Sequence, residues 1–271
     1  MVGSVNTNIA AQIALQNLNV TSSDLQTTQK AISTGLRVSD AFDNGAVFAI
    51  AQGLRSDISA IATVNGQLGA AKGLLQVANA AGTGVSNTLN SIRNVLVQLA
   101  DQNTTGNARS QLNAQYATLK TAVNNFISGA NYNGVNLLSA GSANKAVIQD
   151  VQAHQYTIQA NDLNANVTAL LTGVSDATSA AAVLSGGFVS AENFVGTALN
   201  SFAAANAFLD NQITFNNSIS DATSQGLGAL VDADLAKESA RLQSLQIKQQ
   251  LGTQSLGIAN QAPQILLGLF R

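Results

Sequence analysis

The sequence has no cysteine, no tryptophan, one proline and a single histidine in 271 residues. Without cysteine the chain forms no disulfide and offers no thiolate, either as a nucleophile or as a zinc ligand. A zinc site needs more ligands than His154 alone supplies, and we expect this histidine to lie on the surface. These absences argue against thiol enzymes and zinc enzymes.

Charged and aromatic residues are also scarce, at 10% and 4% of the chain. The 12 Lys and Arg residues are scattered singly and the net charge is −2, so no basic stripe is available for nucleic acid. Asn and Gln supply about a fifth of the residues. Surfaces that lack strong like-charge repulsion favour association. We therefore expect no nucleic-acid partner and a tendency to self-associate.

Long apolar runs are missing too. No run reaches the length of about 18 residues that a transmembrane helix needs, so no membrane insertion is expected. Residues 1–20 contain no Lys or Arg, and Asn and Gln interrupt their apolar residues. This pattern differs from a Sec-type signal peptide. We expect a chain that stays in the cytosol or leaves by another route.

Few patterns in the sequence resemble a catalytic or ligand site. The glycines of Gly82–Gly84 lie within a helical pattern without the third glycine of a nucleotide loop, so a helix irregularity is expected there. The loop Asp40–Asn44 has calcium-binding residue types but no Glu at the twelfth position. The two Glu residues, Glu192 and Glu238, lie on separate predicted helices and form no acid/base pair. We predict no enzyme activity and no catalytic, cofactor-binding or metal-binding residues.

Both ends of the chain carry an amphipathic helical pattern. Apolar positions recur by alternating fours and threes from Val231 to Ala259, which is the spacing of a coiled-coil seam. The same spacing runs from Ala11 to Leu36. The two ends are therefore predicted to pair. Several seam positions are Ser, Gln, Gly or Ala, so the pair alone buries too little apolar surface to offset its ordering entropy.

Further apolar residues lie off this seam, at Ile247, Leu251 and Ile258 and in the run Ile265–Phe270. This pattern indicates a helix that neighbouring subunits contact on several sides. An ordinary antiparallel helix pair that closes a bundle is the alternative. The residues that we predict to drive assembly are Leu15, Leu18, Leu25, Ile32, Leu36, Leu235, Leu242, Leu245, Leu256, Leu266 and Phe270.

A longer seam extends from Ile50 to Leu99 and is apolar except at Asp57 and Gly82. A continuous helix of some 50 residues spans roughly 75 Å at 1.5 Å per residue. After a turn at Asp101–Gly106, the apolar spacing from Leu112 to Phe126 predicts a returning helix. These two helices are expected to form an antiparallel hairpin.

The middle of the chain contains the predicted β structure. Asn131–Leu138 contains Asn-Gly between alternating residues, a strong hairpin signal, and residues 145–160 read as a second extended region. A short helix is predicted from Asp176 to a break at Gly186 and Gly187, after which Ser190 caps a long helix. The predicted fold is mainly α, a long coiled-coil helical rod with paired terminal helices, a helical hairpin and a small β region.

Glycines mark the expected joints between parts of this fold. Gly226 and Gly228 separate the last long helix from the terminal seam, and Gly35 and Gly45 flank the polar loop that follows the first helix. We predict that these four glycines act as hinges.

Several motifs together resemble one family, the bacterial flagellins, and in style the short alphaproteobacterial type. The resemblance covers nearly the whole chain, and its most specific part is the ending. It is carried by Ser4–Asn8, Ser33–Ala46, Tyr132–Gly134, Val231–Ala240, Ser255–Pro263 and the closing Leu269–Arg271.

The resemblance implies three parts. Residues 1–45 and 227–271 would form the coiled-coil inner tube of a filament, and 46–139 with 190–226 a helical shell. Residues 140–189 would form a short exposed middle segment with a β-hairpin and a short helix. The implied function is that of an extracellular structural subunit of the flagellar filament, the propeller for swimming.

The resemblance also implies partners. These are further copies of the chain and paralogous flagellins, the filament cap, hook-associated junction proteins, an export chaperone and the flagellar type III apparatus. The chain would be exported unfolded and polymerised at the distal tip. No cofactor is implied.

A surface on the shell helices of flagellins is recognised by Toll-like receptor 5. Ser91, Asn94 and Gln115 stand where recognised flagellins carry Arg, Glu and Glu. Losing a charged anchor from an interface costs about 2 kcal/mol or more. We therefore expect weak or absent receptor activation.

Two other functions fit the same scaffold. A hook-filament junction protein shares the terminal helices, although the ending of this chain resembles a filament subunit. A surface adhesin or glycan-binding protein would need an aromatic or charged cluster in residues 140–189, where the aromatic residues are Tyr156 and Phe188.

Overall fold

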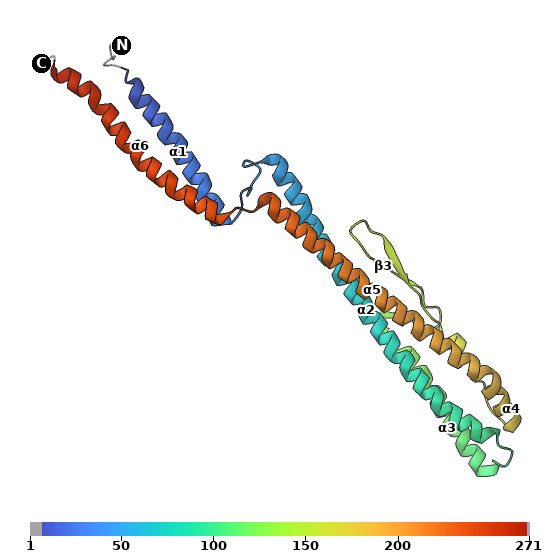
Figure 1. The fold of residues 1–271 in the computed structure, drawn as a ribbon. Coiled ribbons are helices and arrows are strands. Elements are labelled where there is room, and N and C mark those ends of the chain that lie inside the picture. Colours follow the sequence, from blue (N-terminus) through green and yellow to red (C-terminus); the bar gives the residue numbers. More distant parts are fainter. Residues whose placement is uncertain (1–6, 270–271) are drawn as a thin grey trace. The chain divides into compact units, whose positions relative to one another are not determined.

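The structure, a computed structural model, describes residues 7–269, with side chains described as far as residue 261 (Figure 1). The chain divides into two compact units. The terminal unit comprises residues up to Ser56 and from Asp221 onward, and the central unit comprises Asp57–Ser220. Both ends of the chain therefore belong to the same unit.

Two long helices of the terminal unit lie side by side, α1 (Ile9–Thr34) and α6 (Leu235–Leu269) (Figure 1). The side-chain oxygen of Asn8 caps α1 by accepting from the Ala11 amide at 3.0 Å. The Asn8 amide nitrogen also donates to the Ala259 carbonyl at 2.6 Å, so the start of α1 lies beside the far part of α6. The predicted pairing of the two ends is confirmed, and the two helices run antiparallel.

Helix α1 ends at a glycine in the left-handed conformation, Gly35 with φ 71°. The chain then crosses to the residues before α6: Leu36 forms an antiparallel bridge with Asp232, and the Arg37 amide donates to the Val231 carbonyl at 2.7 Å. Val38 is buried there against Ala51 of α2 (Gly45–Ala100) and Val231 of α5 (Phe188–Val231). This small cluster fixes the chain between α1 and α2.

The central unit has one continuous apolar core. It is built by the part of α2 from Asp57 onward, by α3 (Gly106–Gly129) and by the part of α5 up to Ser220. The predicted seam of α2 is buried from Ile61 onward, where Leu68, Leu89 and Leu99 are each 0–1% exposed. Ile50, at which the seam was expected to begin, is 54% exposed. The predicted helical hairpin is therefore confirmed.

Helix α2 runs through Gly82 and Gly84 without interruption, so the helix irregularity expected there is wrong. The glycines instead make room for neighbours. A Cβ at Gly82 would stand 2.9 Å from the Leu199 side chain of α5, and one at Gly84 would stand 2.8 Å from the ring of Phe126 in α3. These glycines allow close approach of the packed side chains.

Two small antiparallel hairpins follow α3 (Figure 1). The first joins β1 (Asn131–Tyr132) to β2 (Val135–Asn136) through Asn133 and Gly134, both with positive φ, as a two-residue hairpin turn requires. The second pairs β3 (Lys145–Ile148) with β4 (Gln155–Ile158). Both confirm the predicted β region.

The second hairpin is fastened to α5 by a buried amide. Asn216 is 2% exposed, and its side-chain nitrogen donates to the Gln149 carbonyl and to the Asn65 side chain of α2, each at 3.0 Å. The Gln212 side chain donates to the same Gln149 carbonyl at 3.2 Å. One polar cluster therefore joins both long helices to the end of β3.

The connection into α5 differs from the prediction. After the π-helical turn η1 (Asn164–Thr168), α4 (Ala177–Ala182) begins with a capping box and continues through a second π-helical turn, η2 (Val183–Gly187), directly into α5. The expected glycine break and Ser190 cap are wrong. A Cβ at Gly187 would meet the Leu170 carbonyl oxygen at 2.3 Å, so this glycine permits a close backbone approach.

The end of α5 also lies further along than predicted. Gly226 and Gly228 are inside the helix, which ends at Val231. The interruption before α6 falls at residues 232–234, where Asp234 caps α6 by accepting from the Ala236 and Lys237 amides.

Among the described residues, no helix combines the length and apolar character that crossing a membrane requires.

Candidate assembly surfaces of the terminal unit

The predicted assembly residues differ in how far they are buried. Leu245 is buried at 5% exposure, and six others are half-buried, of which Leu36 follows α1 and packs on the Val38, Ala51 and Val231 cluster. Leu15 and Leu235 remain 48% and 49% exposed. Phe270 and the side chain of Leu266 lie outside the described residues. The half-buried group is Leu18, Leu25, Ile32, Leu36, Leu242 and Leu256.

The seam between α1 and α6 buries few side chains. In these two helices only Thr28 and Leu245 are buried among the side chains that the structure describes. A Cβ at Gly252 would lie 3.3 Å from the Leu18 side chain, so the helices approach closely at that point. The small residues of such a seam leave little apolar area to bury within one chain.

Each helix of the pair also leaves a second apolar stripe exposed, and the two stripes are called here the open apolar face. On α6, Ile247, Leu251 and Ile258 are 58%, 56% and 70% exposed, as their position off the seam predicts. On α1, Ile9 and Ile13 are 65% and 54% exposed. These two residues lie outside the predicted seam, although their spacing of four, with Val20 seven further on, marks a second stripe in the sequence.

A polar network orders the loop between α1 and α2. The Lys30 ammonium, in the last turns of α1, contacts the carboxylates of Asp40 at 2.5 Å and Asp43 at 3.0 Å. Asp43 also accepts from the Ser39 amide and hydroxyl, each at 2.9 Å. Hydrogen bonds from Ser39 and from Lys30 hold the pKa of Asp43 well below its ordinary value.

The same network explains the calcium-like composition of this loop. The hydrogen bond from Lys30 lowers the pKa of Asp40, and the two carboxylates raise the pKa of Lys30 in return. The ammonium thus lies between the carboxylates that a cation would use. In the part of the chain that the structure describes, no group of three or more His, Asp or Glu residues has metal-binding geometry.

One large apolar side chain on this loop has no covering at all. Phe42 is 101% exposed. Its amide donates to the Asp40 carboxylate at 2.8 Å, so the backbone beneath the ring is held although the ring is free. Sequence reasoning missed Phe42, because a single aromatic residue in a polar loop produces no periodic signal.

The polar candidates of the sequence lie at surface positions of the central unit. His154 is in the turn between β3 and β4, with its Nδ1 2.6 Å from the Asp150 carboxylate and its side chain 68% exposed. Glu192 pairs with Arg93 across α5 and α2. Ser91 and Asn94 on α2 and Gln115 on α3 are exposed.

Comparison with known sequences identifies the relatives of this chain. Residues 5–143 match the bacterial flagellin N-terminal helical region, and residues 192–270 match the bacterial flagellin C-terminal helical region. Flagellin FljO of Caulobacter vibrioides is 36% identical over 273 residues, covering 100% of this chain and 99% of the relative. A flagellin of Brucella melitensis is 34% identical over 293 residues and both chains are covered completely.

Solved structures show the same fold. A Bacillus cereus flagellin aligns with a TM-score of 0.51 at 21% identity, covering 54% of this chain and 86% of that one. A protein described as flagellar hook-associated, from Vibrio parahaemolyticus, aligns with a TM-score of 0.59 at 13% identity, covering 70% of this chain and 100% of that one.

The two matched regions begin near residue 5 and end at residue 270, and the curated relatives align from end to end. The paired terminal helices, the open apolar face and the small β region all lie within these alignments. This chain belongs to the bacterial flagellin family, whose members are the structural subunits of the extracellular flagellar filament.

Proposed function

We propose that this flagellin polymerises by burying the open face of α1 and α6 against other copies of itself. As a flagellin, the chain is a structural subunit of the flagellar filament, which lies outside the cell and propels swimming. The observation that carries the proposal is the row of half-exposed or more exposed apolar residues on both terminal helices.

The energetic case rests on this open face. Complete burial of one Ile or Leu side chain contributes about 1.5–3 kcal/mol. Ile9, Ile13, Ile247, Leu251 and Ile258 are all more than half exposed. Because each side chain is already partly buried in the monomer, the five together contribute only a part of their full burial energies, which is of the same order as the roughly 4–15 kcal/mol that association costs in lost freedom. The monomer keeps this surface exposed, and the polymer covers it.

The three-part organisation inferred from the sequence belongs to this proposal. Residues 1–45 and 227–271 line the inner tube, 46–139 and 190–226 form the shell, and 140–189 face outward. The predicted assembly residues contribute in two ways. The half-buried leucines hold α1 to α6, while Leu15 and Leu235 extend the face that other copies cover. Gly35 and Gly45, which flank the loop after α1, serve as hinges between tube and shell, whereas the predicted hinges Gly226 and Gly228 lie inside α5.

The chain acts as a structural protein and performs no catalysis in this proposal. The hydrogen bonds to Lys30 occupy the carboxylates of Asp40 and Asp43. His154 has Asp150 as its neighbour on an exposed turn. The Asp43 carboxylate does accept from the Ser39 hydroxyl, but hydrogen bonds from Ser39 and Lys30 lower its pKa, which makes it a poor general base.

Export and assembly partners follow from family membership. We propose that the chain passes unfolded through the flagellar type III apparatus, held beforehand by a chaperone that covers the apolar face of α6. It then folds at the distal tip under the cap, next to hook-associated junction proteins and paralogous flagellins.

We further propose weak or absent activation of Toll-like receptor 5. Ser91, Asn94 and Gln115 present no charge where recognised flagellins present one, and Arg93 between them is engaged by Glu192. Endotoxin-free monomer applied to receptor reporter cells is expected to give little signal. Robust signalling would contradict this part of the proposal.

No observation favours the alternative functions. The likeness to the hook-associated protein extends to the fold alone at 13% identity. The two aromatic residues available to an adhesin are used inside the fold, since Phe188 is 0% exposed and Tyr156 stacks on Phe208 with ring centroids 4.0 Å apart.

Electron microscopy tests the proposal directly. Purified full-length chain and a chain that ends at Val231, which lacks α6, are each placed in ammonium sulfate with filament seeds. We expect filaments from the full-length chain only. Filaments from the shortened chain, or none from the full-length chain under seeding, would contradict assembly through the terminal helices.

A further inference from the structure

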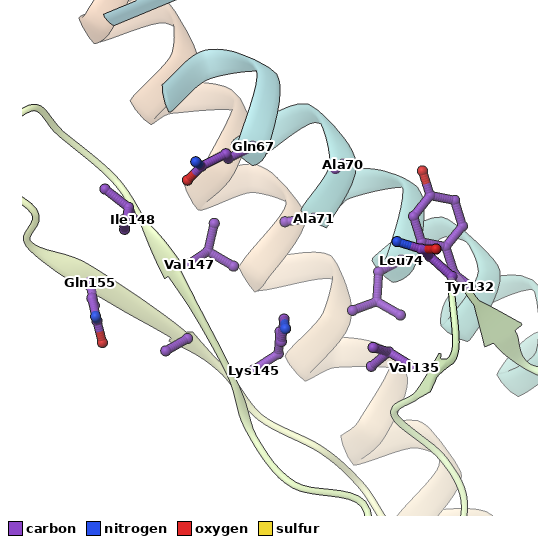
Figure 2. Close-up of a pocket in the computed structure, with 12 residues that line it drawn as sticks. Gln67, Ala70, Ala71, Leu74, Tyr132, Val135, Lys145, Val147, Ile148 and Gln155 are labelled. Atoms are coloured by element: carbon purple, nitrogen blue, oxygen red, sulfur yellow. The ribbon is translucent and has the colours of Figure 1, made fainter. Parts of the chain in front are cut away.

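A groove on the central unit matches the free ring of Phe42 in character. It has a volume of about 520 Å³ and lies between α2 and the two β-hairpins (Figure 2). Its floor includes Ala71 and Leu74 of α2, which are buried, and Val147 of β3. Ala70 and Val135 line its sides. The groove is therefore mainly apolar.

The walls of this groove are held in place. The Tyr132 ring lies against Gly73 of α2, where a Cβ would come within 2.9 Å of the ring. The β3–β4 hairpin is fixed at Gln149 by the hydrogen bonds from Gln212 and Asn216. A groove with fixed walls loses little freedom when it is filled, which favours binding.

Phe42 has the properties of an anchor for such a groove. A phenylalanine ring buries 150–250 Å² when covered, and large aromatic anchors in pockets carry much of the energy of protein interfaces. The ring is fully exposed, and the Asp40–Asp43 loop beneath it is ordered by Lys30 and Ser39. The anchor is presented on a prearranged backbone.

We propose that Phe42 of one copy inserts into the α2/β-hairpin groove of a second copy of this chain. The inference rests on the proposed polymerisation and names one contact within it. Charge supports the choice of partner, because Asp40 and Asp43 flank Phe42 and share the single ammonium of Lys30. Lys145 is the charged residue on the groove lining, and among the described residues it forms no ion pair.

The symmetry of the contact fits a filament. Phe42 belongs to the terminal unit and the groove to the central unit, so each copy offers two different surfaces. A contact between unlike surfaces is heterologous, and it extends into a helical polymer when its rotation does not close a ring. Every copy inside such a polymer both inserts its Phe42 and receives one.

Two other grooves fit the ring less well. The groove between α1 and α6, about 460 Å³, is lined by Asn17 and Ser255 beside Ile13 and small apolar residues, and its lining contains no cation to meet the acidic loop. The groove at Gln76, Asn79 and Asn206 has amides on three of its six lining residues. The α2/β-hairpin groove has them on three of twelve, Gln67, Asn133 and Gln155. The α2/β-hairpin groove combines an apolar floor with a positive edge.

The absence of cysteine makes the contact directly testable. In the variant carrying Phe42→Cys and Ala70→Cys, oxidation of the polymer is expected to join successive copies and give a ladder of covalent oligomers on denaturing gels. Ala70 is exposed, so the substitution disturbs no core. The matched control carries Phe42→Cys and Ser91→Cys, with Ser91 exposed on the same helix.

A ladder in the first variant and none in the control would support the contact. Filaments of the first variant that give no ladder, or equal ladders in both variants, would overturn it. Because oligomers require links between chains, a disulfide formed within one chain does not produce a ladder.

A second variant keeps the test independent of the engineered thiols. Phe42→Ala is expected to raise the critical concentration for polymerisation about 30-fold, the effect of losing a typical anchor, while monomer unfolding stays unchanged. An unchanged critical concentration would overturn the Phe42 contact. Failure of the wild-type chain to polymerise would instead contradict the proposed function, so the two failures are distinguishable.

Discussion

The terminal and central units are both built from long helices but bury their apolar residues in different ways. In the central unit, residues of α2, α3, α5 and both hairpins share one continuous core. In the terminal unit the buried apolar cluster consists of Val38, Ala51 and Val231, and α1 and α6 expose much of their apolar surface. We therefore expect the central unit to be stable by itself and the terminal unit to gain stability from contacts with other copies.

Two phenylalanines of α5 test the contribution of the central core. Phe202 is 1% exposed and Phe215 is 59% exposed. Phe202→Ala is expected to lower the free energy of unfolding by about 3–5 kcal/mol, because it removes buried contacts and leaves a cavity. Phe215→Ala should change it by no more than about 0.5 kcal/mol. Chemical denaturation of the monomer measures both, and equal effects would contradict the assigned core.

Two adjacent asparagines test the polar attachment of the second hairpin. Asn216→Ala removes the donor to the Gln149 carbonyl and the acceptor for Gln212, and we expect a loss of about 1–3 kcal/mol. Asn217 is exposed and accepts one hydrogen bond, from Asn65, so Asn217→Ala should cost much less. Denaturant unfolding compares the pair. Similar losses would show that the buried cluster adds nothing specific.

Apolar residues on α6 test the terminal unit, where we expect substitutions to affect polymerisation and not monomer unfolding. Ile247→Ala and Leu251→Ala should leave monomer unfolding nearly unchanged, because both side chains are more than half exposed. Each should raise the critical concentration of polymerisation about tenfold or more, since the polymer buries them. Sedimentation of polymer at several protein concentrations measures this. Gln243→Ala, exposed on the same helix, is the control and is expected to have a smaller effect.

The smallest expected effect is the dependence of the order of the α1–α2 loop on pH. The pKa values of Asp40 and Asp43 lie below their ordinary value of 3.8, and the pKa of Lys30 lies above 10.5. Because the carboxylate pKa values are lowered in the folded chain, ionised Asp40 and Asp43 stabilise the loop above pH 3.8. This stabilisation is lost as the pH falls through the folded pKa values. Because the pKa of Lys30 is raised in the folded chain, its ammonium stabilises the loop below pH 10.5. This stabilisation is lost as the pH rises through the folded pKa.

Amide protection of Ser39, measured by nuclear magnetic resonance on the monomer, should therefore remain constant between these limits. Acid should remove it only well below pH 3.8, the ordinary pKa of the carboxylates. In Asp43→Asn the protection should already be reduced at neutral pH. A midpoint at or above the ordinary aspartate pKa in the wild-type chain would contradict the network.

Periodic burial is what made most of this fold predictable. The seam from Ile61 to Leu99 was predictable because one face of α2 packs on the core along its length. The start of α5 was not, because the glycines at 186 and 187 read as a break although η2 continues the helix past them. Close packing against Leu170, which no local pattern encodes, decides the conformation there.

Some residues of the candidate surfaces were likewise predictable from the sequence and others were not. Ile247 and Ile258 stood out because they depart from a regular seam. Phe42 did not stand out in the sequence, because only the structure shows that no side chain covers its ring. The partner of Asp40 and Asp43 was also hidden in the sequence, since Lys30 reaches them from the preceding helix.

Amide hydrogen exchange in monomer and filament tests the central claim most directly. In the monomer, amides of α1 and α6 should exchange much faster than those of α2 between Leu68 and Leu99, because few buried contacts hold the terminal pair. In the filament the terminal amides should become as protected as the central ones. Equal protection of both units already in the monomer would contradict the account.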